Sequence, residues 1–209
     1  MGYLFDLAEK HHTDKRERDH NYVLMYEKLM ERTRLSTKKI LEVGFGEGGS
    51  VKMWQSYFTN ADVYCMEYFG NEHEKVWKSP STNVPFLKVI RGNSTEKATW
   101  DEAPYEIDYI IDDGSHQPED QIATFLFGFP HLKSHGLYFI EDTHCNFEVK
   151  YTGGVDVIYK WVFNYVMEQQ TPGRNYGGNF YQSRPAMPEV VKNIYSYGFY
   201  KSVIVFEKA

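Results

Sequence analysis

The stretch IDYIIDD, residues 107 to 113, constrains the fold more than any other part of this sequence. Its side chains are nearly all apolar until the two acids at its end, which is the pattern of a strand covered on both faces. Such strands occur in sheets that carry a layer of helices on each side. The stretch therefore predicts an α/β protein built around a mostly parallel sheet.

The rest of the chain supplies the other elements of such a sheet. Runs rich in β-forming residues predict further strands at 38–43, 61–67, 84–90 and 136–142, and a terminal antiparallel hairpin from NIYSYGFY and KSVIVFEKA. Apolar residues at helical spacing predict helices around 22–29, 51–58, 122–129 and 158–165. Because strand and helix alternate, we expect a three-layer, Rossmann-like architecture in a single domain over residues 1–209, with 1–35 as an N-terminal helical lid.

Composition excludes some classes of protein. A net charge of −6 and a pI near 5.8 argue against a nucleic-acid binder, which usually has a basic patch. No run of 18 apolar residues and no signal-peptide pattern is present, so we expect no membrane span and a cytoplasmic location. Cys65 and Cys145 are too few for a disulfide framework and are interpreted as buried thiols. An exposed aromatic surface would be compatible with a homo-oligomer.

A glycine-rich turn follows the strand at 38–43. In LEVGFGEGGS, residues 41 to 50, Gly44, Gly46 and Gly49 fit the pattern G-x-G-x-x-G between a strand and a helix. Glycines there let the backbone approach a ligand closely, and the helix presents free N–H groups. Glu67, at the end of the next strand, can accept both hydroxyls of a ribose. The motif predicts a nucleoside site; a plain strand-to-helix turn is the alternative.

Two further residues are candidate cofactor contacts. Asn93, in RGNS after the third strand, is placed to reach an adenine edge, although a simple turn also explains it. Asp112, at the end of the 107–113 run, is predicted to contact the cofactor, with capping of the following helix as the alternative.

Three carboxylates follow two of the predicted strands. Asp113 ends one, and Glu141 and Asp142 end another, so the acids converge if those strands are neighbours. Clustered carboxylates are costly without a counter-ion, and three oxygen ligands suit Mg²⁺. His116 would then stand beside a substrate hydroxyl as general base. The alternative is that Asp113 and His116 cap the helix that starts at Pro118.

The charged segment HHTDKRERDH, residues 11 to 20, precedes the first predicted helix. Its histidines fit no standard zinc spacing, so a solvated segment is favoured and a lid over the site is the functional alternative.

These motifs together resemble a known family, the metal-dependent sugar O-methyltransferases of macrolide biosynthesis (macrocin and mycinamicin type). This family is a branch of the class I S-adenosylmethionine methyltransferases. The resemblance runs from LAEKHHTDK through LEVGFGEGGS, IIDDGSH and FIEDTH to GFYKSVIVFEK. The combination of IIDDGSH with a later IED is its specific part. The resemblance implies a seven-stranded sheet.

The resemblance also implies roles for individual residues. Asp113, Glu141 and Asp142 would hold Mg²⁺, and His116 would be the general base. Residues implied as contacts of S-adenosylmethionine are Glu42, Gly44, Gly46 and Glu67.

Three functions therefore compete at this point. The first is Mg²⁺-dependent methyl transfer from S-adenosylmethionine to a hydroxyl of a small molecule, such as a sugar, a polyol or a natural product. Tyr151, Tyr176 and Tyr181 are candidates to shape the pocket for this acceptor. The second is an NAD-dependent oxidoreductase, which leaves the acids unexplained. The third is a catalytically silent nucleoside-binding domain, whose cofactor affinity would be indifferent to metal.

Overall fold

The computed structural model describes residues 2–68, 70, 75, 84–152, 156–170 and 189–209. Its centre is one seven-stranded sheet with the strand order β3-β2-β1-β4-β5-β7-β6. The strands are β1 (Lys39–Val43), β2 (Asp62–Glu67), β3 (Lys88–Arg91), β4 (Ile107–Asp112), β5 (Leu132–Ile140), β6 (Ile194–Tyr200) and β7 (Val203–Lys208). The first five are parallel, and β7 is antiparallel to both β5 and β6.

Helices of the described residues precede, connect and follow these strands. The α-helices are α1 (Tyr3–His11), α2 (Val23–Met30), α3 (Gly49–Tyr57), α5 (Lys97–Trp100), α6 (Pro118–Gly128), α7 (Val149–Thr152) and α8 (Val157–Gln170). The short 3₁₀ helices are η1 (Glu31–Thr33), η3 (Phe129–His131), η4 (Thr143–Phe147) and η6 (Glu189–Asn193). None of the helices within the described ranges is both long and apolar enough to cross a membrane.

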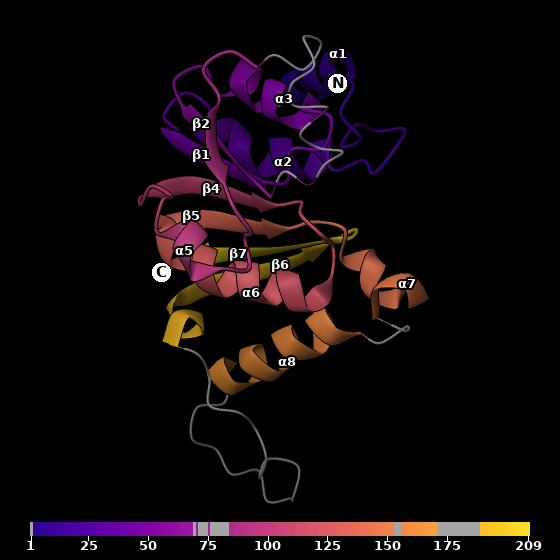
Figure 1. The fold of residues 1–209 in the computed structure, drawn as a ribbon, viewed down its shortest axis with the longest axis vertical. Helices are drawn as coiled ribbons and strands as arrows, with labels where there is room; N and C mark the ends of the chain where they lie inside the picture. Colours follow the sequence, from indigo (N-terminus) through magenta and orange to yellow (C-terminus); the bar gives the residue numbers. More distant parts are fainter. Residues whose placement is uncertain (1, 69, 71–74, 76–83, 153–155, 171–188) are drawn as a thin grey trace, which may run out of the picture.

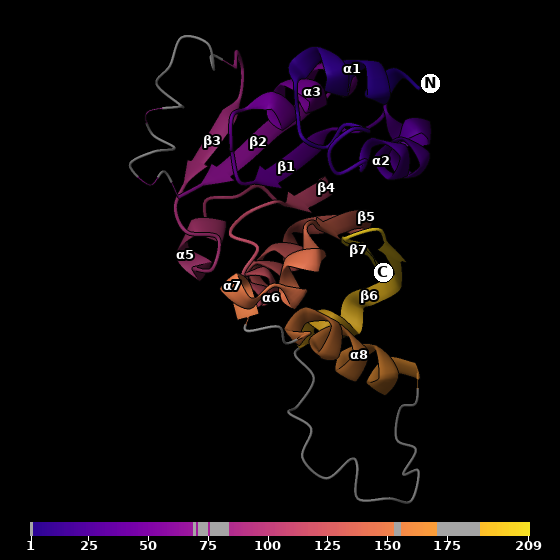
Figure 2. The same ribbon diagram turned by 90° about the vertical axis from the view of Figure 1, so that its right-hand side faces the viewer.

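Helices cover both faces of the sheet. The helices α1, α2 and α3 pack on one face, and α5, α6 and α8 pack on the other (Figure 1 and Figure 2). Strand β4 shows why, because Ile110 belongs to the core on the α6 face and Ile111 to the core on the α2 face. Successive side chains of a strand point to opposite faces, so a continuous apolar run requires a cover on each. The three-layer prediction is confirmed.

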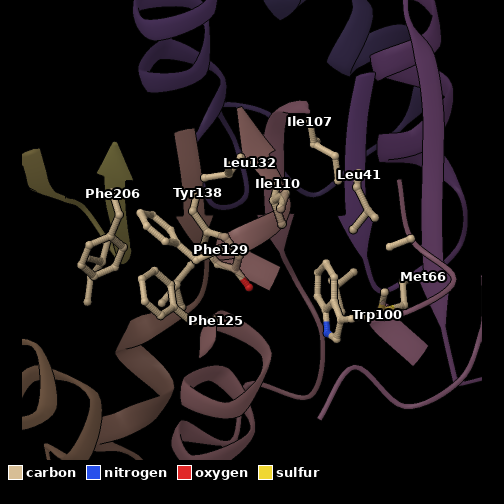
Figure 3. Close-up of a cluster of buried hydrophobic side chains, with 14 of the residues drawn as sticks. Leu41, Met66, Trp100, Ile107, Ile110, Phe125, Phe129, Leu132, Tyr138 and Phe206 are labelled. Carbon is tan, nitrogen blue, oxygen red and sulfur yellow. The ribbon is translucent and has the colours of Figure 1, made fainter. Parts of the chain in front are cut away.

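Aromatic side chains dominate the core on the α6 face. Phe125 of α6 packs edge-on against Tyr138 of β5, and its ring centroid also lies 4.7 Å from that of Phe206 of β7 (Figure 3). Trp100 of α5 belongs to the same core and is almost fully buried. The terminal hairpin is part of the main sheet because β7 pairs with β5, and its Phe206 belongs to this core.

The structure moves some of the predicted boundaries. The run 84–90 becomes a strand only at Lys88, because Pro85 has no N–H and Phe86 has a positive φ of 63°. The strand predicted at 136–142 spans Leu132–Ile140 and stops before the acids. The seven-stranded, mostly parallel sheet with an antiparallel end confirms the fold class.

The order of the strands reverses between β1 and β4, which is where open α/β sheets bind ligands. Gly44 follows β1 there with φ 94°, and a Cβ on it would lie 2.1 Å from the carbonyl oxygen of Asp113. No other residue type fits so close an approach. Gly44 therefore brings the first glycine turn against the end of β4.

Candidate active site

A cavity of about 1110 Å³ opens at the carboxyl ends of the parallel strands. Its volume is sufficient for a nucleoside cofactor with room beside it. The predicted site residues that line it are Gly44, Gly46, Glu67, Asn93, Asp113 and His116. The structure therefore brings the glycine turn and the IIDDGSH motif to one cavity.

Glu67 and Asn93 are held in place by short hydrogen bonds. Glu67 Oε2 accepts a hydrogen bond of 2.7 Å from the backbone N–H of Phe45, which ties the end of β2 to the glycine turn. Asn93 Oδ1 accepts from the backbone N–H and the hydroxyl of Thr95, at 3.0 and 2.9 Å. Both side chains are thus oriented before any ligand arrives.

Glu42 and Asp112, the other two predicted cofactor contacts, are buried and are not among the residues that line the cavity. Glu42 Oε2 accepts a hydrogen bond of 2.8 Å from the hydroxyl of Ser50. Burial raises the pKa of Asp112 well above its usual value, although the N–H of Gly114 opposes this. Both carboxyl groups lie beneath the cavity wall.

The acids at the strand ends do converge. Strands β4 and β5 are parallel neighbours, and the N–H of Glu141 donates to the carbonyl of Asp112 at 2.9 Å. Asp113 therefore lies beside Glu141, as expected if the strands are adjacent. Asp142 adopts a left-handed backbone conformation, with φ 52°, which is uncommon for a residue other than glycine.

A lysine ammonium lies inside this group of acids. Lys15 Nζ is 2.6 Å from Asp113 Oδ2, 2.5 Å from Glu141 Oε2 and 3.4 Å from Glu42 Oε1. The Lys15 side chain is only 1% exposed. Burial alone would lower the pKa of Lys15, but the carboxylates of Asp113 and Glu141 raise it well above its usual value, so the ammonium stays charged.

Two tyrosines from the N-terminal part also bind the acids. The Tyr26 hydroxyl donates to Glu141 Oε1, and the Tyr22 hydroxyl donates to Asp142 Oδ1 at 2.5 Å. Burial and the neighbouring carboxylates raise the pKa of both hydroxyls, so both remain neutral donors. With Lys15 on one oxygen and Tyr26 on the other, both oxygens of Glu141 have a partner.

Histidines surround Asp142. His116 Nε2 lies 3.5 Å from Asp142 Oδ2, and the rings of His20 and His144 place Nδ1 atoms 3.7 and 3.8 Å from Oδ1. His116 also has a positive φ, at 59°. Sparsely populated backbone conformations of this kind cluster at functional sites.

Asp113, His116 and Asp142 fit a divalent cation. One ligand atom from each lies within 4.8 Å of the others, so the three side chains could contribute ligands to one metal ion. The buried Nδ1 of His116 has no hydrogen-bond partner among the described residues. Glu141 accepts hydrogen bonds from Lys15 and Tyr26, and Asp113 also accepts one from Lys15. The role of Glu141 as a metal ligand stays a prediction.

Lys15, Tyr22 and Tyr26 are site residues to which the sequence patterns assign no role, although Lys15 ends the stretch LAEKHHTDK that carries part of the family resemblance. The prediction of a solvated segment at 11–20 is wrong for Thr13 and Lys15, which are buried. A lysine within a run of charges carries no pattern that distinguishes burial from exposure.

Tyr151 is one of the three tyrosines predicted to lie near the acceptor. Its ring centroid lies 6.4 Å from that of His116 in an edge-on arrangement. Tyr176 and Tyr181 lie outside the described residues.

The buried Glu42 leads to a prediction of pH-dependent stability. Burial raises the pKa of Glu42 from 4.5 to about 7, opposed in part by Lys15. Because the folded value exceeds the unfolded one, its stabilising contribution is complete below pH 4.5 and is lost as the pH rises to 7. The loss is on the order of 3 kcal/mol.

The measurement is the free energy of unfolding of the wild type and of Glu42→Gln between about pH 5 and pH 8. We expect the wild type to lose stability relative to the variant up to about pH 7, and the difference to level off above it. Parallel curves across this range would contradict the prediction.

Sequence comparison finds O-methyltransferases among the relatives of this chain. It is 31% identical over 153 residues to 8-demethyl-8-(2-methoxy-alpha-L-rhamnosyl)-tetracenomycin-C 3'-O-methyltransferase of Streptomyces olivaceus, a match that covers 68% of this chain. The chain is therefore a homologue of sugar O-methyltransferases of the macrocin, mycinamicin and tetracenomycin type. This methyltransferase homologue is also 27% identical over 151 residues to mycinamicin VI 2''-O-methyltransferase of Micromonospora griseorubida, covering 66% of this chain. No family model matches the sequence.

The fold of this methyltransferase homologue agrees with a solved structure. The MycE methyltransferase of the mycinamycin biosynthetic pathway, in complex with Mg and SAH, superposes with a TM-score of 0.78 at 24% identity. The superposition covers 100% of this chain and 55% of MycE. The matches to the two curated relatives cover only 37% and 35% of those proteins. The chain therefore spans well under half the length of these relatives.

Proposed function

We propose that the protein is an S-adenosylmethionine-dependent O-methyltransferase that uses a divalent cation, Mg²⁺ in the first instance. The observation that carries the proposal is that Asp113 and His116 line the same cavity as Gly44, Gly46 and Glu67. Groups suited to deprotonating a hydroxyl thus share one space with a nucleoside-binding turn.

The acceptor is a hydroxyl of a small molecule, with a sugar-linked natural product as the first choice. The curated relatives are named for methylation of sugar substituents, and MycE was solved with Mg and SAH. Residues 1–209 act as one methyltransferase domain, and 1–35 form its lid. Thr13, Arg16 and Asp19 of that lid line the cavity.

The residues of this chain divide the work of the reaction. Glu67, which lines the cavity at the end of β2, would accept hydrogen bonds from the ribose hydroxyls of the cofactor. Asp113 and Asp142 would hold the cation, which would supply positive charge that lowers the pKa of an adjacent hydroxyl. S-adenosylmethionine would supply the methyl group to the acceptor oxygen and would leave as S-adenosylhomocysteine, with its bond from sulfur to the methyl carbon broken.

His116 takes the proton that the acceptor hydroxyl loses. Its ring lines the cavity, and its Nε2 faces Asp142, so a protonated imidazole gains a carboxylate neighbour at 3.5 Å. Orientation and charge therefore provide the catalysis, without a covalent enzyme intermediate.

The first test is a calorimetric titration of metal-stripped protein with S-adenosylhomocysteine, comparing wild type with Glu67→Gln. Glutamine keeps an acceptor for the Phe45 N–H but removes the charge that receives the ribose hydroxyls. We expect the affinity to fall by about 10- to 100-fold, the range for a hydrogen bond to a charged group. Glu119→Gln, an exposed position of α6, is the matched control and should bind as the wild type does.

The same titration separates the competing functions. Tight binding of NAD with no heat from S-adenosylhomocysteine would contradict the proposal and favour the oxidoreductase. Binding of S-adenosylhomocysteine followed by a Mg²⁺ step would support it and justify screening sugar-linked acceptors for methylation.

A further inference from the structure

Lys15 has no role in the proposed reaction, although the Lys15 side chain is almost completely buried within the site. Its ammonium contacts Asp113 and Glu141 at 2.6 and 2.5 Å and lies 3.4 Å from Glu42. Burial of an ammonium is costly, and three close carboxylates are the arrangement that offsets the cost. A lysine held in this way is fixed in position as firmly as a core residue.

The backbone of Lys15 is fixed as well. Its carbonyl oxygen accepts hydrogen bonds from the N–H groups of Tyr22 and Val23, at 3.0 and 3.2 Å. Val23 is the first residue of α2, so this carbonyl satisfies N–H groups that a helix start leaves without an intrahelical partner. The same residue therefore contacts the start of α2 through its backbone and the acids through its side chain.

The segment around Lys15 forms one wall of the cofactor cavity. Its residues that line that cavity are His12, Thr13, Asp14, Arg16 and Asp19. The segment also packs closely on the glycine turn, because a Cβ on Gly49 would lie 2.9 Å from the carbonyl oxygen of His11. Movement of Lys15 would therefore shift both the cavity wall and the acids.

We propose that Lys15 is a positioning residue that orients the carboxylates of Asp113 and Glu141 and, through the same contacts, holds residues 12–22 as the wall of the cofactor cavity. The ammonium binds Asp113 Oδ2, so Asp113 Oδ1 is available to bind a cation. Glu141 is the counter-ion of Lys15. The packing of residues 12–22 along the cavity and the convergence of Asp113 and Glu141 then occur together. The catalytic meaning of this contact rests on the proposed function, but the contact itself can be tested without turnover.

The test is a double-mutant cycle on metal-free, cofactor-free protein, with the variants Lys15→Met, Glu141→Gln and the two combined. Lys15→Met leaves buried carboxylates without their cation, and we expect the Tm to fall by about 10 °C. The combined variant removes one of those charges as well, so it should recover a substantial part of the loss. Additive effects of the two changes would overturn the proposal, because they would reduce Lys15 to a packing role.

Lys10→Met is the matched control, since Lys10 is exposed on α1 in the same N-terminal part. It should change the Tm by less than about 2 °C. At a temperature where Lys15→Met is folded, its affinity for S-adenosylhomocysteine should be at least about tenfold below that of the wild type, while Lys10→Met binds normally. Unchanged affinity of Lys15→Met would contradict the role in the cavity wall.

If Lys15→Met does not fold, Glu141→Gln provides the second measurement. Hydrogen exchange of the Tyr22 and Val23 amides, which bond to Lys15, should be faster in this variant than in the wild type, with exchange in α6 unchanged. Equal exchange at those amides would overturn the proposal. If the cycle shows coupling but no variant binds S-adenosylhomocysteine, the contact of Lys15 with the acids is supported and the methyltransferase function is rejected.

Discussion

Replacing His116 by glutamine is expected to lower the turnover number by a factor of about 10² to 10⁴, the usual contribution of a general base. Glutamine fills much of the same space but cannot take a proton at neutral pH. The affinity for S-adenosylhomocysteine and for Mg²⁺ should change little, because in the proposed mechanism His116 acts on the acceptor. The measurements are steady-state turnover with an accepted sugar substrate and calorimetry of both ligands.

The matched control is His135→Gln, whose exposed ring contacts Glu207 of β7. His135 lies in the first half of β5, whereas the acids follow the end of that strand. The control should therefore turn over as the wild type does. A loss of Mg²⁺ affinity in His116→Gln would contradict the role as base and make His116 a metal ligand, which its place beside Asp113 and Asp142 also permits.

Replacing Asp142 by asparagine is expected to weaken Mg²⁺ binding by at least about 100-fold and to reduce turnover with it. The change keeps the shape of the side chain and its contact with Tyr22 but removes a full negative charge from the cation's ligands. Affinity for S-adenosylhomocysteine should remain, because Asp142 is not among the residues that line the cofactor cavity.

Calorimetry of metal-stripped protein with Mg²⁺ checks this result. Asp101→Asn, an exposed partner of Lys97, is the control and should bind Mg²⁺ normally. If Asp142→Asn binds Mg²⁺ as tightly as the wild type does, Asp142 is not a ligand of the cation. The histidines around Asp142 would then have no role in metal binding through it.

Local sequence patterns are sufficient to predict the fold and the position of the cavity. The 107–113 run is apolar on both faces, and a strand of that kind requires helices on each side of its sheet. Gly44 at the end of β1 and Asp113 at the end of β4 follow parallel strands, whose carboxyl ends share one edge. Because these features depend on residues close together in the chain, their pattern is visible in the amino-acid sequence.

The boundaries of strands are harder to predict from the sequence. The run 84–90 has the composition of a strand, yet residues 84–87 lie outside strand β3. Among them, the side chain of Phe86 is 95% exposed. The composition describes the residue types of the whole run, whereas a positive φ at a single residue interrupts the hydrogen bonding of a strand.

The sheet, the glycine turn, and the acids and histidine near it all follow from the order of residues in the chain. How the charge of those acids is balanced does not, because it depends on the folded arrangement. The clustered acids of the sequence predict a metal as their counter-ion, and the structure also places the ammonium of Lys15 between Asp113 and Glu141. The two contacts join residues 98 and 126 positions apart, and no local periodicity records such a pairing. Electrostatic attraction acts through space, so these partners meet only when the chain is folded.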